Sequence, residues 1–320
     1  MRRPLLAQSL HRPRGAAGAA AAAAVLLWAA SLLAAQAPAV PTPESPVRAV
    51  AVEPATLRVD PDPSSAVVGQ VLPGQNLAVL NLAHGFAQVF AGRSGWMLDK
   101  GLVRLTQPGG GEILFGAASQ FEQRAEDASG QRVAAQNAAR LYYSVYDNFP
   151  SSPLAGEALY RAAEIRWQLG LNDMPVVADP SQRRFPDDSL LKRVRSKYPG
   201  TPWAARADFL LLQEKLTCGI WDSKPSCIGK EIDHYRDYLK KYPRGPRSAE
   251  AAYDIVYRDG AAWSLYRAGD HADAGKAAHY RAAALADAAA VERDFPGTDW
   301  AAQAALIAFK IEQDIAVYPG

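Results

Sequence analysis

The sequence of 320 residues has little cysteine and histidine, and no large excess of either charge. It contains two cysteines and five histidines. Two cysteines exclude a disulfide-dense miniprotein and a zinc module with several cysteine ligands. The formal net charge is +2, and residues 1–39 contribute four arginines and no acidic residue. The remaining 31 basic and 33 acidic residues lack the positive charge typical of nucleic-acid binding, so we expect no nucleic-acid partner.

The sequence also lacks the common catalytic motifs. It contains no glycine-rich phosphate loop, no nucleophile-elbow serine and no His-Glu-x-x-His. Glu231 and His234 have the spacing of the Glu-x-x-His pairs that bind metals inside helix bundles, but a single copy is more typical of a surface pair. We therefore expect no catalytic residues, no metal site, no cofactor and no enzymatic activity.

Residues 1–39 have the pattern of a secretory signal peptide. Arginines at the start precede an alanine-rich apolar run from Ala16 to Ala35, and small residues follow it. The alternative is an uncleaved anchor, because the run is long enough to span a bilayer, and association with a membrane is expected only in that case. We favour cleavage and export to the periplasm or another extracytoplasmic space of a bacterium. Residues 40–47 form a proline-rich spacer, which is typically extended.

Residues 48–106 alternate apolar and turn-forming residues in short runs. Glycine, proline and aspartate separate five or six such runs within about 60 residues, which predicts a small β-barrel. Six markers occur in order: Leu57-Arg58-Val59, Pro63-Ser64, Val68-Gly69-Gln70-Val71-Leu72, Pro73-Gly74, Gly85-Phe86-Ala87-Gln88-Val89 and Gly95-Trp96-Met97.

This order resembles the bacterial SH3-like domain. The resemblance covers about a fifth of the chain and implies an envelope protein that binds peptidoglycan or a peptide. The candidate residues for a ligand groove are Asp60, His84, Phe86 and Trp96. The alternative places Phe86 and Trp96 in the barrel core and His84 in a turn, because a small barrel needs large aromatic residues to fill its interior.

A glycine-rich hinge at 107–111 separates this region from alanine-rich sequence with helical periodicity at 112–318. An aromatic-proline marker recurs there four times, with its aromatic residues spaced by 49, 44 and 53 positions. Proline ends one helix, and a following Ser or Thr with Pro starts the next. The markers are Phe149-Pro150, Tyr198-Pro199, Tyr242-Pro243 and Phe295-Pro296.

The markers predict helix pairs at about 112–150, 153–199, 202–243 and 246–296, with a last helix at 299–316. Such pairs must stack to bury their apolar faces. The turn around Gly269 resembles that of a tetratricopeptide repeat, and the markers are similar to those of periplasmic repeat proteins of envelope assembly. The resemblance implies a scaffold that binds protein partners. The expected fold class is thus a multidomain α+β protein, with a small SH3-like β-barrel followed by an all-α array of tetratricopeptide-like helix hairpins.

Cys218 and Cys227 flank a loop of Gly, Asp, Ser and Pro between two helices. In an exported protein, a disulfide closing this loop is favoured over free thiols. Basic residues cluster at 183–197 and 240–247, where they could face an anionic partner or simply form solvated helix faces.

These features lead us to expect a non-enzymatic, exported scaffold of the cell envelope. Its SH3-like domain would bind cell-wall glycan or peptide, and its helical repeats would bind a protein partner. The first alternative is a component or regulator of a peptidoglycan hydrolase with an unrecognised active site. The second is a purely architectural protein that spaces other components.

Overall fold

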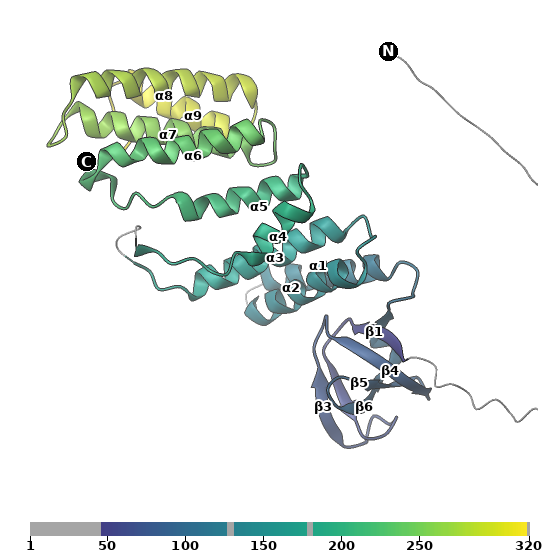
Figure 1. Ribbon diagram of the computed structural model, residues 1–320. Coiled ribbons are helices and arrows are strands. Elements are labelled where there is room, and N and C mark those ends of the chain that lie inside the picture. Colours follow the sequence, from purple (N-terminus) through teal and green to yellow (C-terminus); the bar gives the residue numbers. More distant parts are fainter. Residues whose placement is uncertain (1–45, 127–130, 178–181, 319–320) are drawn as a thin grey trace, which may run out of the picture. The chain divides into compact units, whose positions relative to one another are not determined.

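The computed structural model describes residues 46–126, 131–177 and 182–318. Within these ranges, a seven-stranded antiparallel sheet precedes a series of helices, so the fold is α+β (Figure 1). The predicted signal peptide and most of the predicted spacer lie outside the described residues. Among the residues described, no helix is both long and apolar enough to cross a bilayer.

The sheet is built from short hairpins within residues 47–104. Its strands are β1 (Val47–Ala51), β2 (Ala55–Arg58), β3 (Val67–Val71), β4 (Asn76–Ala83), β5 (Phe86–Phe90), β6 (Ser94–Leu98) and β7 (Leu102–Arg104). The spatial order is β3-β2-β6-β5-β4-β1-β7. His84 and Gly85 form the turn between β4 and β5, and both have the positive φ that a tight two-residue hairpin requires.

The predicted barrel is matched only in part. The short antiparallel strands are present in the predicted region, but the described strands form an open sheet with β3 and β7 at its edges. β7 pairs with β1, and its Val103 packs against helices instead of against the sheet interior. The interior face is formed by small and aliphatic residues, including Leu57, Val71 and Met97.

A shared core joins the sheet to the first helices. Along β1, Ala49 and Ala51 face the sheet interior, whereas Val50 packs with Val103 against Leu114 of α1 (Gly110–Glu126) and Leu141 of α2 (Gln131–Asn148). Successive side chains of a strand point to opposite faces, so one strand can serve two cores. The sheet and the helices are thus packed together by buried side chains.

The segment expected as a glycine-rich hinge is part of this packing. α1 begins at Gly110, inside the predicted hinge 107–111, and Gly110 and Gly111 are both buried. A Cβ atom at Gly110 would lie 2.7 Å from the Phe149 ring and 3.1 Å from Val103. The glycines at this position therefore allow close packing, because any larger residue would collide with the ring.

The helices follow the predicted pairs. After α1 and α2 come α3 (Ala155–Asp173), α4 (Ser189–Lys197), α5 (Pro202–Leu212), α6 (Ile228–Lys241), α7 (Ser248–Arg267), α8 (Ala274–Asp294) and α9 (Asp299–Glu312). Each aromatic-proline marker falls between one pair and the next. Helices α6 to α9 contact one another in sequence, and α9 also contacts α7 (Figure 1).

A hydroxyl group organises the chain at two of the markers. Thr201 and Thr298 accept hydrogen bonds from the first turns of α5 and α9 and donate to the carbonyls of Tyr198 and Phe295. Thr201, which precedes Pro202, is a predicted helix cap, whereas Thr298 caps α9 without a following proline. At the first marker, α3 begins at Ala155 instead of directly after Ser152, because Ser152 closes a turn by accepting from the Leu154 N–H.

Small residues recur where neighbouring pairs approach. Ala158, Ala207, Ala251 and Ala304 occupy the same position after their respective markers, and all four are fully buried. An alanine at this position lets adjacent backbones lie close together. The repeat seen in the sequence is therefore also a repeat of packing.

Candidate functional site

The face of the sheet opposite its core is partly exposed and carries large apolar side chains between polar ones such as Gln88 and Ser94. Along β5 and β6, Ala87, Val89 and Met97 lie in the core. The alternate residues face outward: Phe90 is 49% exposed, Leu98 is 45% exposed and Trp96 is half-buried. A partly exposed face with large apolar side chains is typical of a binding surface.

The structure brings together two of the four predicted groove residues. Phe86 pairs with Leu98 across β5 and β6, and Trp96 pairs with Gln88 two residues along, so both aromatic side chains share the outward face. Phe86 is nevertheless buried, as the core alternative predicts, whereas Trp96 is only half-buried, and neither belongs to the aliphatic cluster on the inner face of the sheet. A cavity of about 250 Å³ lies beside Phe86, and Arg58 and Leu98 also line it. We call the face formed by Phe86, Phe90, Trp96 and Leu98 the outer sheet face.

The other two predicted groove residues lie in separate turns. Asp60 belongs to the turn between β2 and β3, where its carboxylate accepts a 3.2 Å hydrogen bond from the Ser65 hydroxyl. His84 forms the exposed turn between β4 and β5. Neither lines the cavity beside Phe86. Asp60 and His84 therefore belong to turns. For His84 this is the alternative that the sequence analysis gave.

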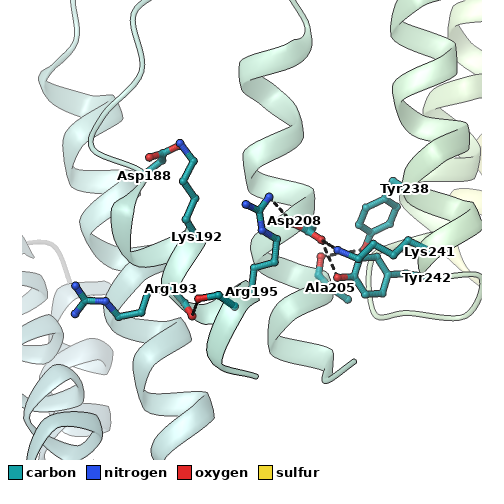
Figure 2. Close-up of polar contacts among 10 residues, drawn as sticks. Asp188, Lys192, Arg193, Arg195, Ala205, Asp208, Tyr238, Lys241 and Tyr242 are labelled. Atoms are coloured by element: carbon teal, nitrogen blue, oxygen red, sulfur yellow. Dashed lines mark hydrogen bonds and ion pairs between the residues drawn. The ribbon is translucent and has the colours of Figure 1, made fainter. Parts of the chain in front are cut away.

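A second candidate surface lies where α4, α5 and α6 meet (Figure 2). Asp208 of α5 is its centre. Its carboxylate accepts hydrogen bonds from Lys241 at 2.5 Å and from the Tyr242 hydroxyl at 2.7 Å, and it pairs with Arg195 of α4 at 3.4 Å. The Asp208 side chain is 14% exposed, so the two cations lie over a nearly buried carboxylate.

These contacts raise the pKa of the neighbouring groups. The pKa of Lys241 is raised mainly by its hydrogen bond to Asp208. The pKa of Tyr242 is raised mainly by burial and, second, by its hydrogen bond to the same carboxylate. Tyr238, one turn earlier on α6, is buried and donates to the Ala205 carbonyl at 3.1 Å. Lys241 therefore keeps its positive charge, and the two tyrosines stay neutral.

A cavity of about 210 Å³ opens beside this cluster. Lys215 and His234 also line it, and within the described residues neither side chain has a hydrogen bond or ion pair. We call this cavity the basic pocket and define it by Arg195, Asp208, Lys215, His234 and Lys241. The basic pocket contains Arg195 from the basic cluster at 183–197 and Lys241 from the cluster at 240–247.

Other residues of these clusters have partners within the chain. Lys192 pairs with Asp188, and Lys240 pairs with Asp237. Arg193 points away from Arg195 and donates to the Tyr143 hydroxyl at 3.1 Å (Figure 2). Several basic residues of the two clusters therefore make contacts within the chain.

The predicted disulfide is present between Cys218 and Cys227, whose Cα atoms lie 5.5 Å apart. The Cys218 N–H donates to Glu231 of α6, and Arg258 of α7 donates to the same carboxylate at 3.1 Å. Glu231 is 4% exposed, so the expected surface pair of Glu231 with His234 is wrong. Its partner lies 27 residues away, where spacing along one helix gives no signal.

A carboxyl pair between α7 and α8, of which Asp259 is buried and Asp287 is partly exposed, was not predicted from the sequence. Asp259 is 1% exposed and lies in hydrogen-bond contact with Asp287, which also pairs with Arg236 of α6 at 3.6 Å. Burial, followed by the negative charge of Asp287, raises the pKa of Asp259 to about 8. Asp259 is therefore protonated at neutral pH.

Within the part of the chain that the structure describes, no three His, Cys, Asp or Glu side chains are grouped to hold a metal ion. No protein-family model matches the chain, and no curated protein matches it.

Proposed function

We propose that the protein is a non-enzymatic, exported scaffold of the bacterial cell envelope. In this proposal, the sheet is an SH3-like domain that binds cell-wall glycan or peptide. The helices are a tetratricopeptide-like array that binds a protein partner. The single observation that carries the proposal is the outer sheet face, because unpaired aromatic side chains on a sheet bind apolar ligand faces.

The positions of the sequence markers support the SH3-like assignment. Leu57 and Arg58 lie on β2, and the Gly85–Val89 marker covers the turn before β5 and most of that strand. The Gly95–Met97 marker lies on β6, which pairs with both β2 and β5. The three markers therefore form one adjoining set of strands, and the outer sheet face belongs to them.

A repeated contact supports the assignment of the array. Trp203 stacks on Tyr160 with ring centroids 5.9 Å apart, and Trp300 packs on Tyr253 at 5.3 Å. The equivalent position of the intervening pair is Arg247, whose guanidinium lies 4.6 Å from the Phe209 ring. Each pair thus uses the start of its first helix to contact the first helix of the preceding pair, as stacked repeats do.

Export is supported by the charge pattern of residues 1–39 and by the disulfide, since disulfides persist in oxidising compartments. Pelleting with purified peptidoglycan tests the proposal. The full chain is expected to pellet, and variants of the outer sheet face are expected to stay in solution. Failure of the full chain to pellet would exclude the wall-binding role.

A second candidate is the component or regulator of a peptidoglycan hydrolase. The observation that favours it is the hydrogen-bonded pair of Asp259 and Asp287, because two carboxyls that share a proton form the dyad used by aspartic proteases to hydrolyse peptide bonds, and the cell wall contains peptide cross-links. Release of soluble fragments from purified wall by the full chain, abolished in Asp287→Asn, would establish this candidate. Fragment release that is the same in both proteins would show a contaminating hydrolase.

A further inference from the structure

Another cavity, of about 330 Å³, lies between α6, α7 and α8, one helix pair further towards the C-terminus than the basic pocket. Its floor is apolar and includes Leu239, Ile255 and Phe295. We call it the apolar pocket. The C-terminal turn of α6 separates the two pockets, since Lys241 lines the first and Pro243 lines the second.

The two pockets occupy the same repeat positions. Markers two and three are 44 residues apart, and markers three and four are 53 apart. Adding 44 carries Arg195, Asp208 and Leu211 of the basic pocket onto Leu239, Ala252 and Ile255 of the apolar pocket.

The agreement continues on the second helix of each pair. Adding 53 carries His234, Asp237 and Tyr238 onto Asp287, Ala290 and Val291. The same step carries Lys241 and Tyr242 onto Asp294 and Phe295. Consecutive pairs therefore form the same hollow with different side chains.

The chemistry of the two hollows differs in a defined way. In the basic pocket, Asp208 is the only nearly buried acid, and Lys215 and His234 have no hydrogen-bond or ion-pair partner among the described residues. Asp237 also lines the pocket and interacts electrostatically with Lys215 and His234, but neither of these side chains is held by a hydrogen bond or ion pair among the described residues. A ligand with a carboxylate could therefore bind the Lys215 ammonium and the His234 ring.

In the apolar pocket, the acids are already engaged. Asp287 contacts Asp259 and Arg236, and Asp294 pairs with Arg293 at 2.9 Å. The aliphatic floor is unused, and so is Arg244 at the pocket lining, whose side chain has no hydrogen bond or ion pair among the described residues. An aliphatic side chain placed on this floor would bury apolar surface without displacing an ion pair.

We propose that the two pockets form a recognition strip for an extended peptide segment of the protein partner, with an acidic side chain in the basic pocket and an aliphatic side chain in the apolar pocket. The inference rests on the proposed function of the array as a protein-binding scaffold. Repeat proteins present equivalent positions at regular intervals, so an extended chain can meet them in turn. The difference in chemistry fixes the direction and register of that chain.

Selection from a random nine-residue peptide display library on the immobilised full chain tests the strip. The enriched peptides are expected to combine Asp or Glu with Leu, Ile or Val at a fixed spacing. The double variant Lys215→Glu/His234→Glu should lower the affinity for these peptides at least about tenfold, because the two new carboxylates would repel the acidic side chain of the peptide. Lys230→Glu, an exposed charge reversal on the same helix, should change affinity by less than about twofold.

Ala290→Asp places a carboxylate on the apolar floor and should remove the aliphatic preference while retaining the acidic one. No enrichment, enrichment without acidic residues, or equal effects of the Lys215→Glu/His234→Glu and Lys230→Glu variants would each overturn the strip. Peptides that bind the helices but ignore both pockets would overturn the strip alone and leave the scaffold proposal standing. Pelleting with peptidoglycan is read separately and reports only on the sheet.

Discussion

The Tyr242 hydroxyl donates a 2.7 Å hydrogen bond to the Asp208 carboxylate, 34 residues earlier in the chain. This bond joins the aromatic residue that follows α6 to α5, the first helix of the same pair. Tyr238 makes a parallel contact by donating to the Ala205 carbonyl. The aromatic marker therefore holds the two helices of its pair together through hydrogen bonds as well as through packing.

Replacing Asp208 should destabilise the array. Asp208→Ala leaves the buried Tyr242 hydroxyl without its acceptor and Lys241 without its counter-ion, which should lower the free energy of unfolding by about 1–3 kcal/mol. Urea denaturation followed by circular dichroism measures the loss. The control Asp237→Ala removes an exposed ion pair with Lys240 and should leave the urea midpoint nearly unchanged. Equal losses in the two variants would show that Asp208 has no special structural role.

The disulfide should stabilise the connection between α5 and α6. Cys218→Ser/Cys227→Ser opens a loop of about ten residues and should lower the free energy of unfolding by about 2–3 kcal/mol in the chain-entropy description. A reductant should shift the urea midpoint of the native protein toward that of the double variant and leave the double variant unchanged. A native midpoint that is insensitive to complete reduction would contradict this expectation.

The carboxyl pair should make stability depend on pH. In the folded protein the pKa of Asp259 is raised to about 8 by burial and by Asp287, whereas in the unfolded chain it returns to about 3.8. Between these values the folded state holds a proton that the unfolded state releases, so this group's contribution to stability falls as pH rises from about 4 to about 8.

Asp259→Asn should therefore raise the melting temperature at pH 7.5 and change it little at pH 4.5. The control Asp270→Asn, at an exposed position in the turn between α7 and α8, should follow the native profile throughout. Melting curves across this pH range measure the effect. A constant difference between Asp259→Asn and the native protein at every pH would show that titration of Asp259 does not contribute.

The shared core should make the sheet and the first helices unfold together. Val103→Ala removes buried methyl groups from the contact with Leu114 and Leu141 and should cost about 1–3 kcal/mol. Because Val103 belongs to both parts, the amide-exchange signals of the strands and those of α1 and α2, followed by mass spectrometry against urea, should shift to lower urea together. Val133→Ala, on an exposed position of α2, should leave both signals unchanged. Separate transitions for the two signals would favour the flexible hinge expected from sequence.

The pattern of short runs and proline markers predicted where most strands and helices lie. These predictions depend on local backbone geometry, which residue types determine without help from distant parts of the chain. Examples are the His84-Gly85 turn and the Tyr198-Pro199 and Thr201-Pro202 steps. The start of α1 inside the expected hinge was not predicted, because Gly110 is required by the ring of Phe149, 39 residues further along the chain.

The ion pairs and pockets could not be predicted for a related reason. Glu231 meets Arg258, and Asp259 meets Asp287, only after α6, α7 and α8 pack side by side. The unequal spacings of the markers, caused by connectors of different length, also hide the equivalence of His234 with Asp287. Phe86 and Trp96 were identified as groove candidates by resemblance, but only the strand register places both on the outer sheet face.

The central claim is that the outer sheet face anchors the protein to the cell wall. Deletion of residues 48–106 would expose the core shared with α1 and α2, so point variants are the better test. The control Leu306→Ala/Phe309→Ala removes two apolar side chains from α9 that are more exposed than Phe90 and Trp96.

The most direct measurement is the affinity of the full chain for purified peptidoglycan by co-sedimentation, with folding of each variant verified by its melting curve. Phe90→Ala/Trp96→Ala should reduce the affinity at least about tenfold, as expected when aromatic contact residues are removed. The α9 control should bind as the native protein does. Full retention of binding in folded Phe90→Ala/Trp96→Ala, or no binding by the native chain, would contradict the claim.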